Sequence, residues 1–318
     1  MSIKKSKIIS ITCLIFMLST LIIGCSKSSS SKSANTDEKL ENQSKTKIVS
    51  TVKGDVEVPV NPKRIIPLPY SHGNLLSLGV IPVAVGKTYE GAAFYPIIKD
   101  TPIIFKWEAE EIMSFQPDLI FTSDETSYDK FRKIAPTVFI PPDMEAVEST
   151  KFIAEVLGLE EKFIEINKKL EDKIADGKAK LKEAGLYDKR FTIYEAWEES
   201  SMMVVGNKWG RGGNLIYDFL ELKPNERVQN EIINGSGDPY RILSTEVIDK
   251  YAGDYIIFSQ GLENELDFSK NQVWNSIPAV KEGRIVPIDG ELFYYSDIYS
   301  VMAQIDYLIN TLIEVSQK

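Results

Sequence analysis

The chain has 318 residues, with 37 Lys and Arg against 46 Asp and Glu, one His and two Cys. This length allows two domains of about 130 to 150 residues, each large enough to bury its own core, and the hydrophobic content of 43% excludes wholesale disorder. The formal charge of −9 argues against a nucleic-acid partner, because a phosphate-binding surface needs an excess of Lys and Arg.

The first 24 residues are predicted to be a signal peptide. Three lysines and no acid precede an apolar run over residues 8–23, which has the length of a signal-peptide core and is short for a permanent membrane span. The run ends in Leu-Ile-Ile-Gly before Cys25, a pattern that resembles a bacterial lipobox, so we expect cleavage after residue 24 and a lipid on Cys25. The alternative is an uncleaved transmembrane anchor. Residues 25–46, rich in Ser, Lys and Asn, are expected to form a flexible tether.

Removal of the signal peptide changes the inventory of reactive side chains. Cys13 leaves with it and Cys25 carries the lipid, so the folded part has no cysteine and the formal charge falls from −9 to −12. Disulfides, thiolate catalysis and cysteine-bound metal are thereby excluded. Because His72 is the single imidazole, a His-rich zinc or manganese site is disfavoured, and we expect neither a cofactor nor a metal ligated directly by the protein.

From residue 47 onward, short apolar runs alternate with helical patterns. The runs are too uniformly apolar for burial on one face, which is typical of strands in a mostly parallel sheet covered by helices. An amphipathic helix is expected near the C-terminus, with apolar residues at helical spacing from Val301 to Val315. The predicted strands cover residues 64–68, 82–86, 118–121 and 137–140 in one series and 191–194, 202–205, 255–258 and 284–288 in a second.

A segment rich in Glu, Lys, Ala and Leu separates the two series of strands. Residues 160–185 contain no Pro and predict one long helix that ends at Gly185. We therefore interpret residues 47–159 as an N-terminal α/β lobe, 160–185 as an inter-lobe helix and 186–318 as a C-terminal α/β lobe. The alternative is an ordinary surface helix within one large domain.

The two halves share a local pattern. Glu110 precedes the Asp-Leu-Ile-Phe run at 118–121 by eight residues, and Glu246 precedes the similar run at 254–258 by the same interval. Each half is therefore interpreted as a surface helix that carries a glutamate, followed by a buried strand.

The most unusual segment is the glycine loop, residues 206–213, which reads Gly-Asn-Lys-Trp-Gly-Arg-Gly-Gly and precedes a helical pattern. It matches neither a phosphate loop nor the dinucleotide fingerprint. Its glycines permit a tight turn that would place Trp209 and Arg211 side by side. An arginine fork can hold paired ligand oxygens while an indole covers an apolar face. The alternative is that Trp209 is a core residue and that Arg211 pairs with an acid.

Two further segments carry aromatic side chains at predicted strand ends. Residues 292–299 contain three tyrosines after the last strand. Tyrosine is amphipathic and suits the solvent-accessible wall of a binding site. In isolation, such a run is more often ordinary loop and core packing. Tyr70 and His72 follow the first strand, at the edge where open α/β sheets bind ligands. On its own, His72 is expected to be a hydrogen-bonded structural residue.

These motifs resemble a known family, the iron-siderophore substrate-binding lipoproteins that deliver their ligands to ABC importers. The resemblance extends from about residue 47 to the C-terminus and rests on Arg-Ile-Ile at 64–66, the Leu-rich segment 75–80, Gln-Pro-Asp at 116–118 and the long helix. The Trp-Gly-Arg-Gly-Gly sequence at 209–213 is most similar to the ferric-hydroxamate-binding proteins of Gram-positive bacteria. The family implies a class III periplasmic-binding-protein fold, with two α/β lobes joined by a single long helix and the ferric siderophore held between them.

The resemblance also implies roles for individual residues. Trp209 and Arg211 would contact the ligand, Tyr294 would pack against it, and Tyr295 and Tyr70 would form further wall positions. Glu110 and Glu246, one in each lobe, match the glutamates that dock onto the permease. The protein would then be a monomeric, non-catalytic receptor on the extracytoplasmic face of the cell membrane, anchored through Cys25, with a ferric siderophore and an ABC permease as its partners.

The charge of the ligand follows from the number of cations in the motifs. Iron(III) arrives wrapped by the oxygens of its siderophore, so the protein needs no metal ligands of its own. Strongly anionic chelates call for several convergent Arg and Lys residues, whereas the motifs contain Arg211 alone, which favours the neutral or weakly cationic hydroxamates. Lys87, Lys106 and Lys208 are further candidates that could face the cleft. The alternatives are a receptor for a citrate-type siderophore, haem or cobalamin and, less favoured, a surface-tethered hydrolase that would have to use His72.

Overall fold

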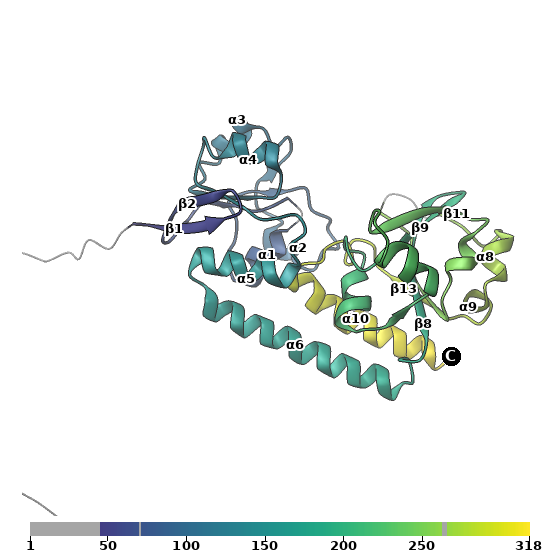
Figure 1. Ribbon diagram of the computed structural model, residues 1–318. Helices are drawn as coiled ribbons and strands as arrows, with labels where there is room; N and C mark the ends of the chain where they lie inside the picture. The colour runs from purple at the N-terminus through teal and green to yellow at the C-terminus, as the bar shows by residue number, and fades with distance from the viewer. Residues whose placement is uncertain (1–44, 70, 263–265) are drawn as a thin grey trace, which may run out of the picture. The chain divides into compact units, whose positions relative to one another are not determined.

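The structure is a computed structural model that describes residues 45–69, 71–262 and 266–318 (Figure 1). The predicted signal peptide, the lipidation site Cys25, nearly all of the tether and Tyr70 lie outside these described residues. Within the described ranges, none of the helices combines the length and the apolar character that a membrane span requires.

The N-terminal lobe has two small parallel sheets and one antiparallel hairpin. The strands are β1 (Thr46–Thr51), β2 (Gly54–Pro59), β3 (Ile65–Ile66), β4 (Val85–Gly86), β5 (Ile103–Ile104), β6 (Leu119–Thr122) and β7 (Thr137–Phe139). The main sheet has the order β3-β6-β7, and the central strand β6 is buried along its whole length. Strands β4 and β5 form a separate parallel pair, while β1 and β2 form an antiparallel hairpin. All four strands predicted in this half are present. The hairpin was missed because most of its residues are exposed or only partly buried, and β5 was missed because it has only two residues.

Five helices connect the strands of this lobe within the described residues. They are α1 (His72–Ser77), α2 (Tyr95–Ile98), α3 (Ala109–Ser114), α4 (Glu125–Phe131) and α5 (Ala146–Leu157). Glu110 lies in the first turn of α3 and is exposed, as the prediction of a surface helix requires. Its neighbour Glu111 accepts hydrogen bonds from the backbone N–H groups of residues 105, 106 and 107, and so fixes the loop before the helix.

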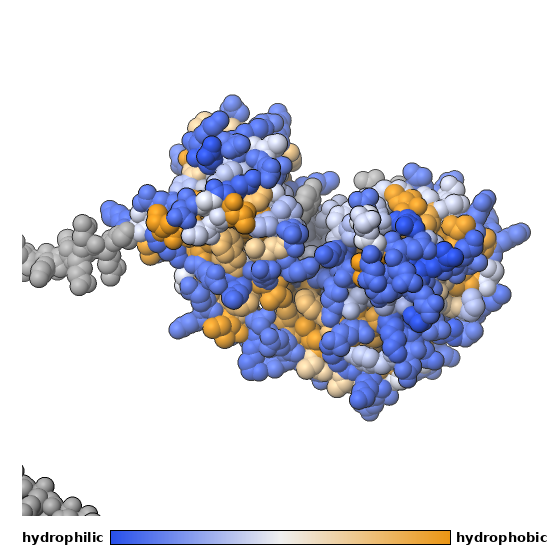
Figure 2. Space-filling view, viewed as in Figure 1, coloured by the Kyte–Doolittle hydropathy of each residue, from blue (hydrophilic) through white to orange (hydrophobic). Residues whose placement is uncertain are grey.

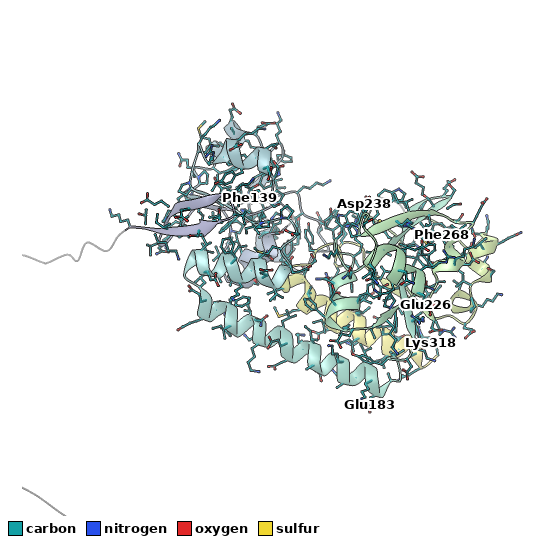
Figure 3. The ribbon with its side chains drawn as sticks, in the orientation of Figure 1. Phe139, Glu183, Glu226, Asp238, Phe268 and Lys318 are labelled. Atoms are coloured by element: carbon teal, nitrogen blue, oxygen red, sulfur yellow. The ribbon has the colours of Figure 1, made fainter. Side chains whose placement is uncertain are left out.

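The long helix α6 (Glu160–Glu183) begins at the predicted residue and ends in a left-handed glycine, Gly185. It runs beside the C-terminal helix α10 (Ile298–Ser316), and Lys173 of α6 pairs with Asp306 of α10 at 2.5 Å. Glu183, at the end of α6, is drawn on the same side of the view as Lys318, beyond the end of α10 (Figure 3). The described residues belong to one compact unit, and the exact lobe boundaries stay a prediction.

The C-terminal lobe is built on a mixed sheet in which one strand, β9, runs against the other five. Its strands are β8 (Arg190–Glu198), β9 (Ser201–Val205), β10 (Lys223–Pro224), β11 (Tyr240–Ser244), β12 (Tyr255–Ser259) and β13 (Ile285–Ile288). The order is β11-β9-β8-β12-β13, with β10 also paired to β8. Strands β8, β12 and β13 are parallel, whereas β9 and β11 run antiparallel to their neighbours. The prediction of parallel strands fails at β9, because the two-residue turn after β8 is too short for a parallel crossover.

Short helices complete this lobe. They are η1 (Asn214–Phe219), α7 (Glu226–Val228), η2 (Gln229–Ile233), η3 (Ile248–Tyr251), α8 (Gln272–Ser276) and α9 (Pro278–Lys281), where η1 and η2 have widened turns and η3 is a 3₁₀ helix. The helix expected after the glycine loop is therefore present as η1. Glu246 is exposed, but it lies in the turn between β11 and η3. The prediction that it sits on a surface helix is wrong, since the chain makes only one 3₁₀ turn before β12.

Buried apolar side chains form one large core and two smaller clusters. The large core includes residues of both sheets and of α5, α6 and α10, so it continues from one lobe into the other. A smaller cluster packs Tyr295 against Leu76 and Phe94 of the N-terminal lobe. Hydrophilic residues dominate the face in Figure 2, and apolar patches interrupt them at several places. Ile48 and Val52, in and next to β1, and Val60, just after β2, are among the exposed apolar side chains.

Candidate functional site

The glycine loop adopts a left-handed backbone over four consecutive residues. The φ angles of Trp209, Gly210, Arg211 and Gly212 are +74°, +74°, +54° and +77°. Glycine accepts this region freely, but a residue with a side chain is strained there by about 1–3 kcal/mol. Two strained residues thus flank a glycine at the positions expected to bind the ligand, and surrounding contacts must hold them in place.

Those contacts come from the tyrosine loop, residues 292–295. A Cβ atom at Gly210 would lie 2.3 Å from the carbonyl oxygen of Tyr294, and one at Gly212 would lie 2.8 Å from the ring of Phe293. The two loops therefore touch through backbone that only glycine permits. Gln304 of α10 is buried and donates hydrogen bonds of 2.8 Å to the carbonyls of Leu292 and Tyr295, which fixes the tyrosine loop from the other side.

Arg211 is held on three sides and is only 6% exposed. Its guanidinium lies over the rings of Trp209 and Tyr294, with centroid distances of 4.7 and 4.3 Å. The carboxylate of Glu195, itself 3% exposed, accepts from Nε at 3.0 Å and from Nη2 at 3.4 Å. The sequence alternative that Arg211 pairs with an acid is therefore realised. This edge-on pair leaves the Nη1 amino group available for another acceptor.

Trp209 is not the core residue that the alternative required. Its side chain is 45% exposed and stacks on Tyr240, with ring centroids 4.4 Å apart and planes inclined by 24°. The stacking restricts the indole while leaving part of it open to solvent. A large apolar surface presented in this way at low conformational cost is typical of a binding wall.

The Arg211 cavity, of about 540 Å³, lies beside this arrangement. Its aromatic lining consists of Tyr89, Trp197, Trp209 and Tyr294. The rings of Tyr89, from the N-terminal lobe, and Tyr294 are 4.7 Å apart. The volume and the aromatic walls with a few polar groups match a site for one small organic ligand. The cavity is lined by Tyr89, Glu195, Ala196, Trp197, Glu198, Trp209, Arg211, Gln260, Gly261, Leu262, Leu266 and Tyr294.

A second, more polar cavity of about 400 Å³ shares the side chain of Trp209. Asn74 and Glu145 of the N-terminal lobe line it together with Lys208 of the glycine loop. The ammonium of Lys208 lies 3.8 Å from the carboxylate of Glu145, so its charge is already paired. Of the three lysines considered from the sequence, Lys208 alone lines either cavity.

The structure brings together three of the five residues expected to bind the ligand. Trp209, Arg211 and Tyr294 line one cavity. Tyr295 does not line it, because its ring is 2% exposed and packs between Tyr294 and Phe94, with centroid distances of 5.0 and 4.8 Å. Burial also raises the pKa of the Tyr295 phenol. The expectation of a wall position is thus corrected to that of a support for Tyr294, and Tyr70 is outside the described residues.

Sequence reasoning missed Glu195, Trp197 and Tyr89. Glu195 lies one residue beyond the predicted strand 191–194, within a strand that is longer than expected. An acid inside an otherwise apolar strand was a signal of a buried partner, because ionised carboxylates are rarely buried unpaired. Trp197 lies at the irregular end of β8, where the register shifts between Ala196 and Glu198. Tyr89 is brought near by the tertiary fold alone.

His72 is fully buried at the start of α1 against the ring of Phe94, with centroids 6.0 Å apart. Neither ring nitrogen has a hydrogen-bond partner among the described residues, so the expectation of a hydrogen-bonded histidine is wrong. Desolvation by burial lowers its pKa from 6.5 to about 4. A fully buried imidazole that lines neither cavity and has so low a pKa is too inaccessible and too weakly basic to be the general base that the hydrolase alternative needs. Also within the described residues, no group of three His, Cys, Asp or Glu could hold a metal ion.

The chain belongs to the periplasmic binding protein family, whose model matches residues 87–292. It is 32% identical over 333 residues to the iron(3+)-hydroxamate-binding protein YxeB of Bacillus subtilis, with 99% of each chain covered.

Solved structures show the same fold. FhuD2 of Staphylococcus aureus with bound ferrioxamine B is 25% identical, with a TM-score of 0.72 over 80% of this chain and 99% of the other. SirA of Staphylococcus aureus complexed with staphyloferrin B is also 25% identical, with a TM-score of 0.71 over 84% of this chain and 98% of the other. The family and the two-lobed α/β fold predicted from the sequence are therefore confirmed.

Proposed function

We propose that this protein is the membrane-anchored substrate-binding lipoprotein of an ABC importer and that it binds a ferric hydroxamate siderophore in the Arg211 cavity. The observation that carries the proposal is the guanidinium of Arg211, which is fixed between two aromatic rings and one carboxylate, lines the cavity and makes no hydrogen bond from Nη1 to another described residue. The likeness to the hydroxamate-binding relative supports the ligand class.

The chemistry of the cavity suits a chelate that brings its own iron ligands. Nη1 can donate to hydroxamate oxygens around the iron, while Trp209 and Tyr294 cover the aliphatic arms of the siderophore. The protein then recognises the outer surface of the complex, and we propose neither a cofactor nor a catalytic step. Tyr89 would contribute a contact from the N-terminal lobe.

Fluorescence titration tests the ligand, because Trp197 and Trp209 line the cavity. Ferrichrome and ferrioxamine B should quench tryptophan emission at micromolar concentration or below. If neither hydroxamate quenches the emission, the proposed ligand class is refuted. Quenching by ferric staphyloferrin B instead would favour the carboxylate alternative, which the likeness to SirA supports, and a Soret shift on titration with haem would indicate a haem receptor.

Replacement of Arg211 tests the site itself. Arg211→Ala should weaken hydroxamate binding by about 1–3 kcal/mol through loss of a charge-assisted hydrogen bond. Because the single variant leaves Glu195 buried without a partner, the measurement is repeated in the Glu195→Gln background. Arg227→Ala is the matched control, since Arg227 also pairs with a carboxylate and lies over a tyrosine ring away from the cavity. Equal affinities for the Arg211 and Arg227 variants would remove Arg211 from the site.

We further propose that the exposed carboxylates of Glu110 and Glu246 dock the protein onto the permease. The double reversal Glu110→Lys with Glu246→Lys should leave siderophore affinity intact and stop uptake of ⁵⁵Fe-labelled siderophore by cells. Normal uptake by cells that carry the double variant would refute this role. The pair of Lys→Glu changes at exposed Lys168 and Lys180 on α6 provides a control for charge reversal as such.

The anchor is proposed at Cys25, on the extracytoplasmic face of the membrane. Cys25→Ala should block lipidation, so that the protein is retained as an unprocessed precursor or released to the medium, depending on cleavage. Metabolic labelling with palmitate distinguishes lipidation from an uncleaved transmembrane anchor. Label on the Cys25→Ala variant would contradict the assignment. We propose a monomer, and light scattering of the soluble part tests that.

A further inference from the structure

The buried pair of Arg211 and Glu195 changes the charge that the cavity presents to its ligand. Both side chains are over nine-tenths buried, and both line the cavity. The opposite charges are joined at 3.0 Å, so a ligand in the cavity meets a dipole rather than an isolated cation. Glu198 lines the same cavity and is exposed. Among the described residues, the three charged side chains that line the cavity, Arg211, Glu195 and Glu198, therefore sum to a net negative charge.

The geometry of the pair adds a second constraint. An arginine binds a carboxylate best through two parallel hydrogen bonds along one edge of the guanidinium. Glu195 occupies such an edge through Nε and Nη2. A carboxylate or catecholate of the ligand therefore finds one of the two bidentate edges already taken, and only the end-on edge of Nη1 and Nη2 is left, on a guanidinium whose charge Glu195 offsets. A neutral oxygen that accepts a single hydrogen bond from Nη1 needs neither the second edge nor the charge.

The lysines considered from the sequence do not line this cavity. Lys87 and Lys106 line neither cavity, while Lys208 lines the neighbouring one, where its ammonium lies 3.8 Å from the carboxylate of Glu145. Aromatic faces supply the rest of the wall, and Trp197, which is 43% exposed beside Glu198, can also attract a cation through its π face. The cavity is thus built for a ligand that carries no net negative charge.

We propose that Glu195 sets the charge selectivity of the site, so that the protein accepts neutral and cationic ferric chelates and rejects anionic ones. The carboxylate does so by neutralising Arg211 and by occupying one of its two bidentate edges. This inference rests on the proposed function, since it concerns the ligand of the same cavity. It assigns Glu195 the role of a specificity-determining residue that acts through Arg211.

Three probes of graded charge test the inference. Ferrioxamine B carries a pendant ammonium, ferrioxamine E has the same type of hydroxamate core without it, and ferric staphyloferrin B is anionic. The wild type should bind both ferrioxamines at least about tenfold more tightly than the anionic chelate, because Glu195 offsets the attraction of several kcal/mol that Arg211 alone would exert on a negative charge about 5 Å away at moderate effective dielectric constant.

Glu195→Gln should reduce the ratio of ferrioxamine affinity to anionic-chelate affinity by about tenfold or more. The main cause should be tighter binding of the anionic chelate to Arg211, whose charge is then no longer neutralised. Glu198→Gln changes the net charge of the cavity by the same amount but leaves the pair intact. Its effect should be smaller, about threefold, because solvent screens an exposed carboxylate. Glu226→Gln is the control outside the cavity, as Glu226 pairs with Arg190 at the surface and should change no ratio.

Since Glu195→Gln leaves a buried guanidinium without its carboxylate, its thermal unfolding is measured first. If that variant does not fold, the double variant Glu195→Gln with Arg211→Gln decides the matter. Its cavity keeps the net charge of the wild type, so the ratio between ferrioxamine E and the anionic chelate should stay within about threefold of the wild-type value. A widening of that ratio by more than tenfold, through a selective loss of anionic binding, would overturn the inference, because Arg211 would then attract the negative charge of the ligand in the wild type.

The failures of the two proposals are distinguishable. If the wild type binds none of the ferric hydroxamates, the proposed function fails. If the wild type binds them and Glu195→Gln shows the wild-type ratio, the site stands and the charge-selective role of Glu195 is refuted.

Discussion

Replacement of Gly210 by alanine should disrupt both the stability of the protein and its ligand cavity. The new Cβ would lie 2.3 Å from the carbonyl oxygen of Tyr294, whereas distances under 3.0 Å essentially never occur for real Cβ atoms. The two loops must therefore separate by roughly 0.7 Å or more. Because backbone rather than a flexible side chain is the obstacle, the strain cannot be relieved by a rotamer change.

The energetic cost has two parts. A left-handed φ of +74° costs a residue with a side chain about 1–2 kcal/mol, and overpacking adds about 1–3 kcal/mol. The sum is about 2–5 kcal/mol. For a chain of this size, each kcal/mol lowers the melting temperature by on the order of 2 °C, so the midpoint should fall by about 4–10 °C.

Gly79→Ala is the matched control. Gly79 has a φ of +79°, and a Cβ there would meet nothing within 4 Å. Its variant should carry the backbone cost alone and lose about 2–4 °C. Thermal unfolding followed by circular dichroism and fluorescence titration with ferrioxamine B are measured for both variants. Hydroxamate affinity should fall about tenfold or more for Gly210→Ala, since the wall residues are displaced, and should be unchanged for Gly79→Ala. Equal melting temperatures and equal affinities in the two variants would refute the reasoning.

Three further predictions concern residues that support the site or the lobes. Burial lowers the pKa of His72 to about 4 in the folded protein, so the fold keeps its full stability above pH 6.5 and loses about 3 kcal/mol of it as the pH falls toward 4. The melting temperature of His72→Leu should therefore decrease less than that of the wild type between pH 7 and pH 5. An equal decrease in the two proteins would contradict the assignment. Backbone N–H groups, that of Phe105 first, lower the pKa of Glu111 below 4.5 in the folded protein. Glu111→Gln should therefore lower the melting temperature at pH 7 more than Glu110→Gln does, and this difference should vanish as the pH falls through the folded-state pKa of Glu111. Equal effects of the two variants at pH 7 would contradict the loop contact. Gln304→Leu leaves two carbonyls of the tyrosine loop without their donor, so it should lower the free energy of unfolding, measured by chemical denaturation, by about 1–3 kcal/mol. A loss below about 0.5 kcal/mol would show that contacts other than these hydrogen bonds fix the loop.

Much of the fold could be predicted because its signals are local. The eight predicted strands and the helix α6 are runs of neighbouring residues whose apolar pattern and breakers act within a few positions. The direction of β9 could not be predicted in the same way, since it depends on which strand its residues pair with. The exposure of Glu246 could likewise be predicted from the sequence. Its position in a turn could not, because the turn depends on how the chain connects β11 to η3.

The sequence by itself determined the family, the long helix, the scarcity of Cys and His and the presence of Trp209 and Arg211 in one glycine loop. The tertiary structure decided what surrounds Arg211. Glu195 is 16 residues away in the chain and Tyr294 is 83 away, and both meet the guanidinium only because β8 and the tyrosine loop pack against the glycine loop. A charge seen in sequence is a property of one residue, whereas the field that a ligand meets is set by every charge around it. The charge of Arg211, the single arginine of the motif, is thus neutralised by Glu195 in the folded protein.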